Sequence, residues 1–386
     1  MTRLNSSFRL SHRILISGIL CVMLCITASA QTEKTEPKSG SDVLILANGD
    51  KLTGQLENTT GPSLVFKSDM AGEVTVDWSK VKEIHTDRQF AVIPKNVRLK
   101  HHADTSSIPQ GSVQLAGKNV QVEPMKGGTA QSVPTANVAH IIDETTFQRA
   151  INNRVGFTKD WVGTVSLGTT LVEATQKNNT ISGAVALVRA VPSQDWLAPE
   201  SRTSFDFSAA YGKLTQPDTP TIKTDLWHLD LEQDEYLTSR LFAFGALAYD
   251  HNFSQGLDLQ QTYGGGLGFT VIKDAIQELD VKASMNYIKQ QFAIASQNQN
   301  LIGSQFAEDY SRKLIHGIVF TESGTYTPAW NNTNAYSATA QAGLVFPIYK
   351  GFSFAIGSLD TFLNNPPPGF KKNSFQFTTA LGYAIK

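Results

Sequence analysis

Alternation of apolar and polar residues is the dominant pattern of the chain from about residue 151 to its end. In one segment Phe205, Phe207 and Tyr211 fall on one side of an extended chain, while Asp206 and Ser208 fall on the other. Successive side chains of a β-strand point to opposite faces, so each such segment has an apolar face and a polar face. The pattern predicts strands that begin near Val155, Asn179, Arg202, Ile222, Arg240, Gln260, Ile276, Phe306, Val319, Ala335, Phe352 and Ser374.

The length of these segments separates two kinds of all-β fold. Strands of soluble sandwiches average about 5 or 6 residues, whereas a tilted strand that crosses a membrane needs about 9–11. The alternating segments are at least as long as the membrane value, and Tyr, Trp and Phe gather near their ends, as an interfacial girdle requires. The sequence therefore predicts an antiparallel transmembrane β-barrel of about 12 strands over residues 151–386. Ten strands remain an alternative if one segment has been divided in two.

The connections between the expected strands alternate in length. Long polar connections at 291–305 and 364–373 follow odd-numbered strands, and short ones such as Lys350-Gly351 follow even-numbered strands. Outer-membrane barrels have short periplasmic turns and longer external loops. The pattern thus predicts that a preceding domain lies in the periplasm, on the side of the short turns. Residues 192–200 are an exception, because this turn is longer and contains Pro192, Trp196 and Pro199.

Two short β units precede the barrel, over residues 42–93 and 94–146. A shift of 57 residues without a gap pairs glycine with glycine and aliphatic with aliphatic residues, which suggests a duplication. Asn48-Gly49-Asp50 supplies hairpin turn chemistry in the first unit. We expect either two small SH3-like barrels or one fused β-sandwich. The paired positions are Gly54 with Gly111, Leu56 with Val113, Val65 with Val122, Val76 with Val133, Val81 with Val138 and Ile84 with Ile141.

Residues 1–30 have the pattern of an export signal. Three arginines precede an apolar run from Ile14 to Ile26, and Ala28-Ser29-Ala30 follows as a small-residue cleavage site. Both cysteines of the chain lie in this segment, so the exported protein would contain no thiol, disulfide or thiolate metal site. The polar residues 31–41 are expected to form a flexible leader. No later apolar stretch is long enough for a membrane-spanning helix.

The charge balance disfavours nucleic-acid binding. Lys and Arg number 33 and Asp and Glu 34, for a net charge of -1, so no overall positive field attracts DNA or RNA. The hydrophobic fraction of 41% and the charged fraction of 17% also argue against general disorder.

The main candidate for chemistry lies on the polar face of one strand. His228, Asp230 and Glu232 alternate with apolar residues, so their side chains share a face, and Asp280 and Lys282 occupy the polar face of another strand. They could form a proton-transfer or cation site inside the barrel. The simpler interpretation, which we favour, is a polar network that fills a narrow lumen.

Other segments carry weaker signals. His101-His102 cannot chelate one ion readily if both lie on a strand, since adjacent side chains point apart, and is best interpreted as polar surface. The run Gly264–Gly268 lacks nucleotide-motif spacing and indicates curvature or close packing. A hydrolase pairing of Ser284 with His228 has no motif to support it. Lys371 and Lys372 follow a stiff proline run and could contact lipid phosphate or an external ligand. The simpler interpretation, which we favour, is a rigid loop tip that the charges keep soluble.

Several motifs resemble those of the salt-induced outer-membrane protein family, a barrel group built on a domain of unknown function. The resemblance rests on Asn48-Gly49-Asp50-Lys51-Leu52-Thr53-Gly54, on Asp77-Trp78, on Glu308-Asp309-Tyr310 and on Asn365-Pro366-Pro367-Pro368-Gly369. It implies an outer-membrane barrel with an N-terminal periplasmic β-domain, and it supplies no reaction, cofactor or catalytic residue. The chain departs from many such barrels by ending on Lys386 rather than on an aromatic residue.

Three functions are compatible with the sequence. The first is a non-enzymatic outer-membrane protein for envelope integrity or adaptation to salt and osmotic stress, a role that comes from the resemblance alone. The second is a narrow channel for ions or small solutes, and the third is a barrel hydrolase. The expected partners are outer-membrane lipid, the barrel assembly machinery and, for the periplasmic units, peptidoglycan or another envelope protein.

Overall fold

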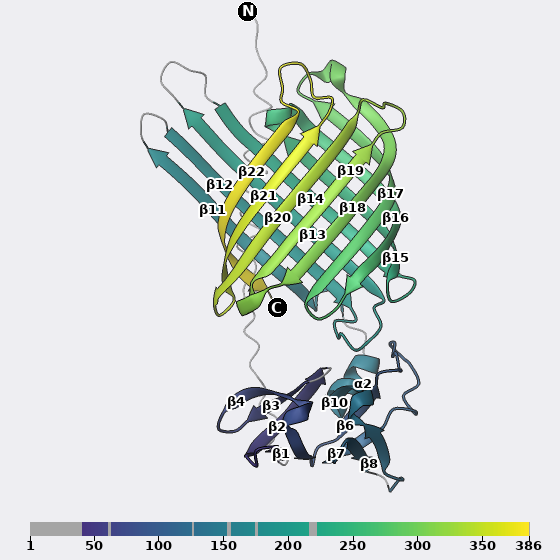
Figure 1. Cartoon of the computed structure of the whole chain (residues 1–386). Helices are drawn as coiled ribbons and strands as arrows, with labels where there is room; N and C mark the ends of the chain where they lie inside the picture. The colour runs from purple at the N-terminus through teal and green to yellow at the C-terminus, as the bar shows by residue number, and fades with distance from the viewer. Residues whose placement is uncertain are drawn as a thin grey trace, which may run out of the picture.

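The computed structural model describes residues 41–60, 63–125, 127–152, 156–173, 177–215 and 222–385, which form two parts, a small N-terminal domain and a large barrel (Figure 1). The predicted signal segment, and all but the last residue of the predicted leader, lie outside these residues, so both stay predictions. Among the described residues, no helix has the length and apolar character needed to cross a membrane.

The N-terminal domain is a closed ring of six strands. The ring runs in the order β1–β5–β7–β6–β10–β2 and returns to β1, with β3 and β4 continuing from β2 and with β8 and β9 continuing from β7. The strands are β1 (Asp42–Leu46), β2 (Lys51–Thr60), β3 (Ser63–Ser68), β4 (Gly72–Asp77), β5 (Val81–His85), β6 (Phe90–Pro94), β7 (Gln110–Ala116), β8 (Asn119–Glu123), β9 (Gln131–Pro134) and β10 (Val138–Asp143), and helix α2 (Glu144–Asn152) follows.

The two sequence units interleave in this single ring rather than forming two separate barrels. The first unit supplies β1, β5 and β2, and the second supplies β6, β10 and β7, so exchanging equivalent strands reproduces the same ring. The short 3-10 turns η1 (Trp78–Lys80) and η2 (Thr135–Asn137) lie 57 residues apart, as the shift predicts. The equivalent Gly54 and Gly111 each pass a partner backbone so closely that a Cβ would lie 2.0 Å and 2.2 Å from a carbonyl oxygen.

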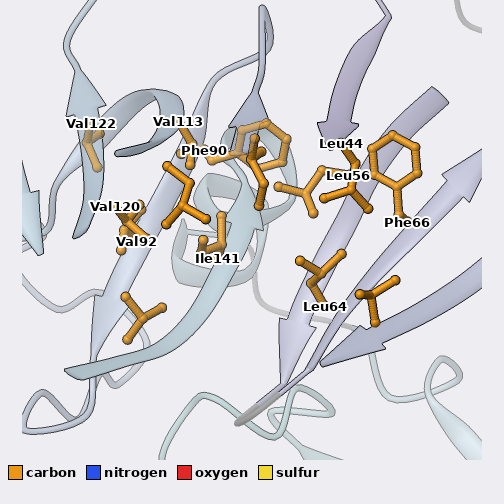
Figure 2. Close-up of a cluster of buried hydrophobic side chains, with 14 residues drawn as sticks. Leu44, Leu56, Leu64, Phe66, Phe90, Val92, Val113, Val120, Val122 and Ile141 are labelled. Carbon is orange, nitrogen blue, oxygen red and sulfur yellow. The ribbon is translucent and has the colours of Figure 1, made fainter. Parts of the chain in front are cut away.

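The ring encloses a core of aliphatic and phenylalanine side chains contributed by both units (Figure 2). Leu56 and Val113, which the shift pairs, are both fully buried, as are Phe66 and Phe90. Each buried side chain of this size stabilises the fold by about 1.5–3 kcal/mol. At the ring's edge, hydrogen bonds from Ser79 hold the pKa of Asp77 below its ordinary value.

The second part confirms the prediction of an antiparallel barrel of about 12 strands. Twelve strands form a closed barrel, in which the last, β22, pairs with the first, β11, through Leu167–Leu381 and Val165–Tyr383. The strands are β11 (Trp161–Glu173), β12 (Lys177–Val191), β13 (Ser201–Thr215), β14 (Ile222–Tyr236), β15 (Leu241–Asn252), β16 (Leu257–Lys273), β17 (Gln277–Phe292), β18 (Gln299–Lys313), β19 (Val319–Pro328), β20 (Tyr336–Tyr349), β21 (Phe352–Leu363) and β22 (Asn373–Ile385).

Strand register assigns each barrel residue to the outside or the lumen. Ion pairs join residues of strands that are not neighbours, as between β13 and β17, and such contacts can only cross the lumen. The opposite faces carry exposed apolar side chains such as Leu267, Phe375 and Leu381. Aromatic pairs lie toward both ends of this outer face, with Tyr249 against Tyr263 at one end and Phe352 against Tyr383 at the other.

The connections follow the predicted parity with one correction. Turns after even-numbered barrel strands lie at the end that faces the N-terminal domain, here called the near end, and the other connections lie at the far end (Figure 1). The expected long connection 291–305 is wrong, because β18 begins at Gln299 rather than near Phe306 and leaves only 293–298 between the strands. The first strand begins at Trp161, and the predicted start at Val155 lies outside the described residues.

The exceptional turn 192–200 contacts the N-terminal domain. Leu197 forms an isolated parallel β-bridge with Leu99, and both side chains are buried in a cluster with helix α2. The Trp196 ring stacks on Phe147 with their centroids 5.5 Å apart. Beside them, Nδ1 of His101 lies 3.1 Å from a carboxylate oxygen of Glu200. The turn is long because it carries the side chains that dock the N-terminal domain.

Candidate functional site

The polar residues predicted on β14 and β17 all point into the lumen, where they join a larger set from β13 to β18. We call the inward face of these six strands the charged wall. The structure brings Lys282 and Glu232 into contact, with the ammonium nitrogen 2.6 Å from the nearer carboxylate oxygen. Asp280 pairs instead with Arg202, a residue that the sequence analysis did not single out.

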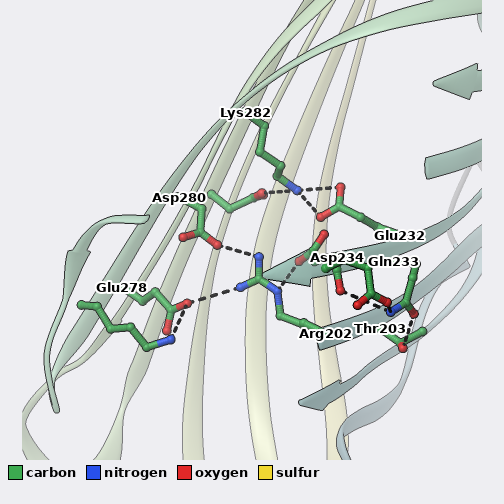
Figure 3. Close-up of polar contacts among 11 residues, drawn as sticks. Arg202, Thr203, Glu232, Gln233, Asp234, Glu278, Asp280 and Lys282 are labelled. Carbon is green, nitrogen blue, oxygen red and sulfur yellow. Dashed lines mark hydrogen bonds and ion pairs between the residues drawn. The ribbon is translucent and has the colours of Figure 1, made fainter. Parts of the chain in front are cut away.

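Arg202 is the centre of the largest ion-pair cluster (Figure 3). Its guanidinium donates to Asp234 and to Asp280 at 2.7 Å each, and it lies 3.3 Å from Glu278. Asp234 and Asp280 are buried, with exposures of 0% and 3%. Charges removed from water are costly unless they are paired and hydrogen-bonded, so Asp234 and Asp280 depend on this one cation. Glu278 also lies 3.7 Å from the ammonium group of Lys273.

Lys282 makes a second cluster farther along the same wall. Its ammonium group contacts Glu232 on β14 and Asp309 on β18, the latter at 2.9 Å. Both cations also lie over aromatic rings that project inward from β15. The guanidinium of Arg202 is 5.3 Å from the ring centroid of Phe242, and the ammonium of Lys282 is 5.6 Å from that of Phe244. Together the two clusters tie β13 and β14 to β17 and β18 across the intervening strands.

The glycine run on β16 makes room for the Phe242 ring and for groups of β17. Gly264, Gly266 and Gly268 all face inward, opposite the exposed Leu267. A Cβ on Gly268 would lie 2.2 Å from the Phe242 ring, and one on Gly264 would lie 1.7 Å from the amide oxygen of Asn286. Close packing, which was one of the two interpretations of this run, is therefore its role.

His228 forms a separate pair toward the far end. Its Nδ1 lies 2.6 Å from Asp250, whose other oxygen accepts a hydrogen bond from Gln260. Asp206 and Asp230 face the lumen nearby without a hydrogen bond or ion pair to any other described residue. A cavity of about 70 Å³ lies beside Asp230, Glu232 and Lys282, large enough for several waters.

The rest of the lumen has a different lining. The inward side chains of β19 to β22, β11 and β12 that the structure describes are uncharged, and most are Ser, Thr, Ala or Gly. We call this face the neutral wall. Gln341 and Thr321 lie within their strands on this wall and are nevertheless exposed. Water can therefore reach the middle of the neutral wall, which long side chains do not fill.

The residues of the other predicted sites are not brought together in the structure, or they have structural roles. His101 and His102 lie in a turn rather than on a strand, and the His101 side chain is only 8% exposed, so its interpretation as polar surface is wrong. Ser284 donates to Asn286 and makes no contact with His228. Lys372 donates to Asn364, whereas Lys371 lines a cavity at the far mouth. No group of three or more His, Cys, Asp or Glu among the described residues could hold a metal ion.

Several charged residues of this wall are not among the predicted site residues. Arg202, Asp234, Asp250, Glu278 and Asp309 were not proposed, although strand periodicity alone would have put each on a polar face. Strand periodicity does not indicate which of these side chains contact one another across the lumen.

The barrel is similar in sequence to one described protein family. The profile of a family described as "Protein of unknown function, DUF481" matches residues 165–385. No curated protein matches the chain.

Solved barrels match at low similarity. An outer-membrane channel from Pseudomonas putida F1 is 10% identical with a TM-score of 0.34, covering 60% of this chain and 100% of that one. The NanC porin is 8% identical with a TM-score of 0.35, covering 58% and 99%. The β-domain of the Bordetella autotransporter BrkA is 11% identical with a TM-score of 0.29, covering 58% and 97%.

Proposed function

The chain belongs to the DUF481 family of proteins of unknown function, and from its lumen we propose that it is a non-enzymatic outer-membrane barrel that provides a narrow aqueous passage favouring cations. The observation that carries the proposal is the divided lumen. One wall is packed with ion pairs, and the other is lined by small polar side chains that water reaches.

The outer face supports a membrane location. Closure of the barrel through the pairing of β22 with β11 gives every strand a partner on both sides, which is what strands need to cross a bilayer. Its outward residues include many exposed apolar side chains, such as Leu267, Phe375 and Leu381, between aromatic pairs at both ends, as in outer-membrane barrels. With the near end in the periplasm, the docked N-terminal domain lies there too, which agrees with the predicted export signal.

The charge of the lumen favours cations. Its carboxylates outnumber the Arg and Lys side chains that pair with them, which are Arg202, Lys273 and Lys282. Acidic side chains along a pore raise the local concentration of cations and lower that of anions. The inward carboxylates of the charged wall are Asp206, Asp230, Glu232, Asp234, Asp250, Glu278, Asp280 and Asp309.

Planar-bilayer recordings test the proposal directly. The purified protein is expected to give conductance steps of defined size, with a reversal potential under a KCl gradient that indicates cation preference. Neutralising the unpaired Asp206 and Asp230 with Asp206→Asn and Asp230→Asn should reduce that preference by at least twofold. The matched control is Glu308→Gln with Glu322→Gln, which removes two carboxylates from the outer face. A silent protein, or equal selectivity in both double variants, would contradict the passage.

A second candidate is a closed barrel that anchors the N-terminal domain at the envelope for integrity or salt adaptation. The docking of the domain through Trp196 and Leu197 favours it, because a fixed domain can present a binding surface toward peptidoglycan or another envelope protein. Co-sedimentation of the exported protein with purified peptidoglycan tests this alternative. Binding that persists in a protein without conductance would favour it over the passage.

A further inference from the structure

The far mouth of the barrel is crossed by contacts between its opposite sides. The turn 253–256 joins β15 to β16, and the connection 364–372 joins β21 to β22. In a closed barrel of twelve strands these two connections are six strands apart, so they start from opposite walls. We call the two joined segments the cross-mouth strap.

Hydrogen bonds and one ring contact hold the strap together. The Gln255 side chain, only 3% exposed, donates to the carbonyls of Thr361 and Lys372 at 3.0 and 2.9 Å. The Ser254 hydroxyl lies 3.2 Å from that of Ser374. The Phe370 ring packs so closely on Gly256 that a Cβ there would lie 2.8 Å from it.

On one side of the strap, toward β16 to β20, the mouth is filled. Leu257, Phe292 and Leu363 form a buried cluster that reaches from β16 and β17 to β21. Beside it, a chain of amide hydrogen bonds runs from Gln260 through Gln290 to Gln299, each link 2.7 Å long. Buried apolar side chains and hydrogen-bonded amides therefore occupy this side of the mouth.

On the other side of the strap the mouth is hollow. A cavity of about 470 Å³, here called the vestibule, lies against β12, β13, β14 and β22. Cavities of about 300–1,000 Å³ are typical of small-molecule sites. Its lining is mostly hydroxyl and amide groups, and the side-chain hydroxyls of Ser182 and Thr224 have no hydrogen-bond partner among the described residues.

The vestibule leads toward the carboxylates of the charged wall. Leu226 on β14 lines it, and Asp230 on the same strand lines the inner cavity, with His228 between them. Inward side chains of one strand repeat about every 6–7 Å, so the two cavities are about 13 Å apart along β14.

We propose that the cross-mouth strap holds half of the far mouth closed and makes the vestibule a size filter for hydrophilic solutes, uncharged or cationic, of about monosaccharide size. This inference rests on the proposed passage. Hydroxyl and amide groups replace the water that such a solute loses, and the carboxylates beyond favour cations over anions. Larger solutes require the strap to separate.

Liposome swelling with glucose and maltotriose tests the filter. Wild-type protein is expected to admit glucose and to admit maltotriose at least tenfold more slowly. The release variant Gln255→Ala with Phe370→Ala should raise the maltotriose rate at least fivefold, and the control Gln291→Ala with Phe306→Ala, both on the outer face and away from the vestibule, should not. Equal rates for the two sugars in wild type, or an unchanged maltotriose rate in the release variant, would overturn the filter.

A disulfide bond across the strap tests the opposite change, in which the two segments cannot separate. Cys21 and Cys25 are the only cysteines of the chain, so Cys21→Ser with Cys25→Ser provides a background without thiols. Ser254→Cys with Ser374→Cys, added to the release variant, should return the maltotriose rate to the wild-type value when oxidised and lose this effect when reduced. Heat-modifiable migration of every variant checks that the barrel has folded.

Thiol labelling separates failure of the strap from failure of the passage. In the same background, Ser182→Cys places one thiol in the vestibule. Its labelling by a bulky, water-soluble maleimide should be at least fivefold faster in the release variant than in the unmodified strap, whether or not the barrel conducts. Equal labelling rates would overturn the strap, whereas faster labelling in a protein that admits no glucose and no ions would reject the passage alone.

Discussion

The charged wall and the neutral wall line the same lumen, yet they use its space in opposite ways. On the charged wall, Arg202 and Lys282 reach over inward phenylalanine rings to carboxylates on distant strands. On the neutral wall, short side chains leave Gln341 and Thr321 exposed to water. A twelve-stranded barrel is wide enough that side chains from one wall cannot fill it, so packing and passage can be divided between the two walls.

This division explains how a polar interior can be rigid and still admit water. Arg202 and Lys282 are largely removed from solvent, and the cost of burying them is offset because Arg202 meets three carboxylates and Lys282 meets two. The neutral wall needs no such partners, because its hydroxyl groups keep their water. The charged wall therefore consists of buried charges that depend on one another, whereas the neutral wall consists of hydrated side chains that do not. Substitutions on each wall can test this difference.

Removing the central cation should have the largest effect on stability. Arg202→Met keeps much of the side-chain volume but leaves Asp234 and Asp280 buried without a counter-ion, which should lower the free energy of unfolding by about 3–5 kcal/mol. Urea unfolding of the refolded protein in detergent, followed by tryptophan fluorescence, measures the loss. The control is Arg312→Met, an exposed outward arginine, and a similar loss in both variants would remove the special role of the charged wall.

Adding one methyl group to a glycine should change the free energy of unfolding by an intermediate amount, and the change should differ between the two walls. Gly268→Ala drives a Cβ into the Phe242 ring and should destabilise by about 1–3 kcal/mol. Gly357→Ala on the neutral wall meets only a carbonyl oxygen at 3.8 Å and should be neutral or stabilising by up to about 1 kcal/mol. The same unfolding measurement compares them. A Gly268→Ala protein as stable as Gly357→Ala would mean that the rings are not packed against β16.

Much of the barrel follows from the sequence because side-chain alternation is a local property. Each strand's polar face, including that of His228, Asp230 and Glu232, can be read from neighbouring residues. The start of β18 was placed too late because residues 299–305 contain Gln, Asn, Gly and Ser, which also suit a loop. Tertiary pairing with β17 overrides that local preference.

The long-range contacts could not be predicted in the same way. Strand alternation places Asp280 on the same face as Lys282, but it does not indicate that Asp280 pairs with Arg202 from four strands away. His101 was expected on the surface because nothing in its local sequence indicates the docking turn. The shift of 57 residues did identify equivalent strands in the N-terminal domain, whereas their interleaving depends on closure of the ring and has no local signal.

An added charge on the neutral wall should have the smallest effect. Gln341→Glu is isosteric and faces water, so the free energy of unfolding should change by no more than about 0.5 kcal/mol. The matched change on the charged wall is Asn286→Asp, where the residue is 4% exposed and donates to Gln305 at 2.7 Å. Loss of that donor in a buried position should cost about 1–3 kcal/mol. If Gln341→Glu proved as costly as Asn286→Asp, the neutral wall would be as dry as the charged wall, and the aqueous path along it would be lost.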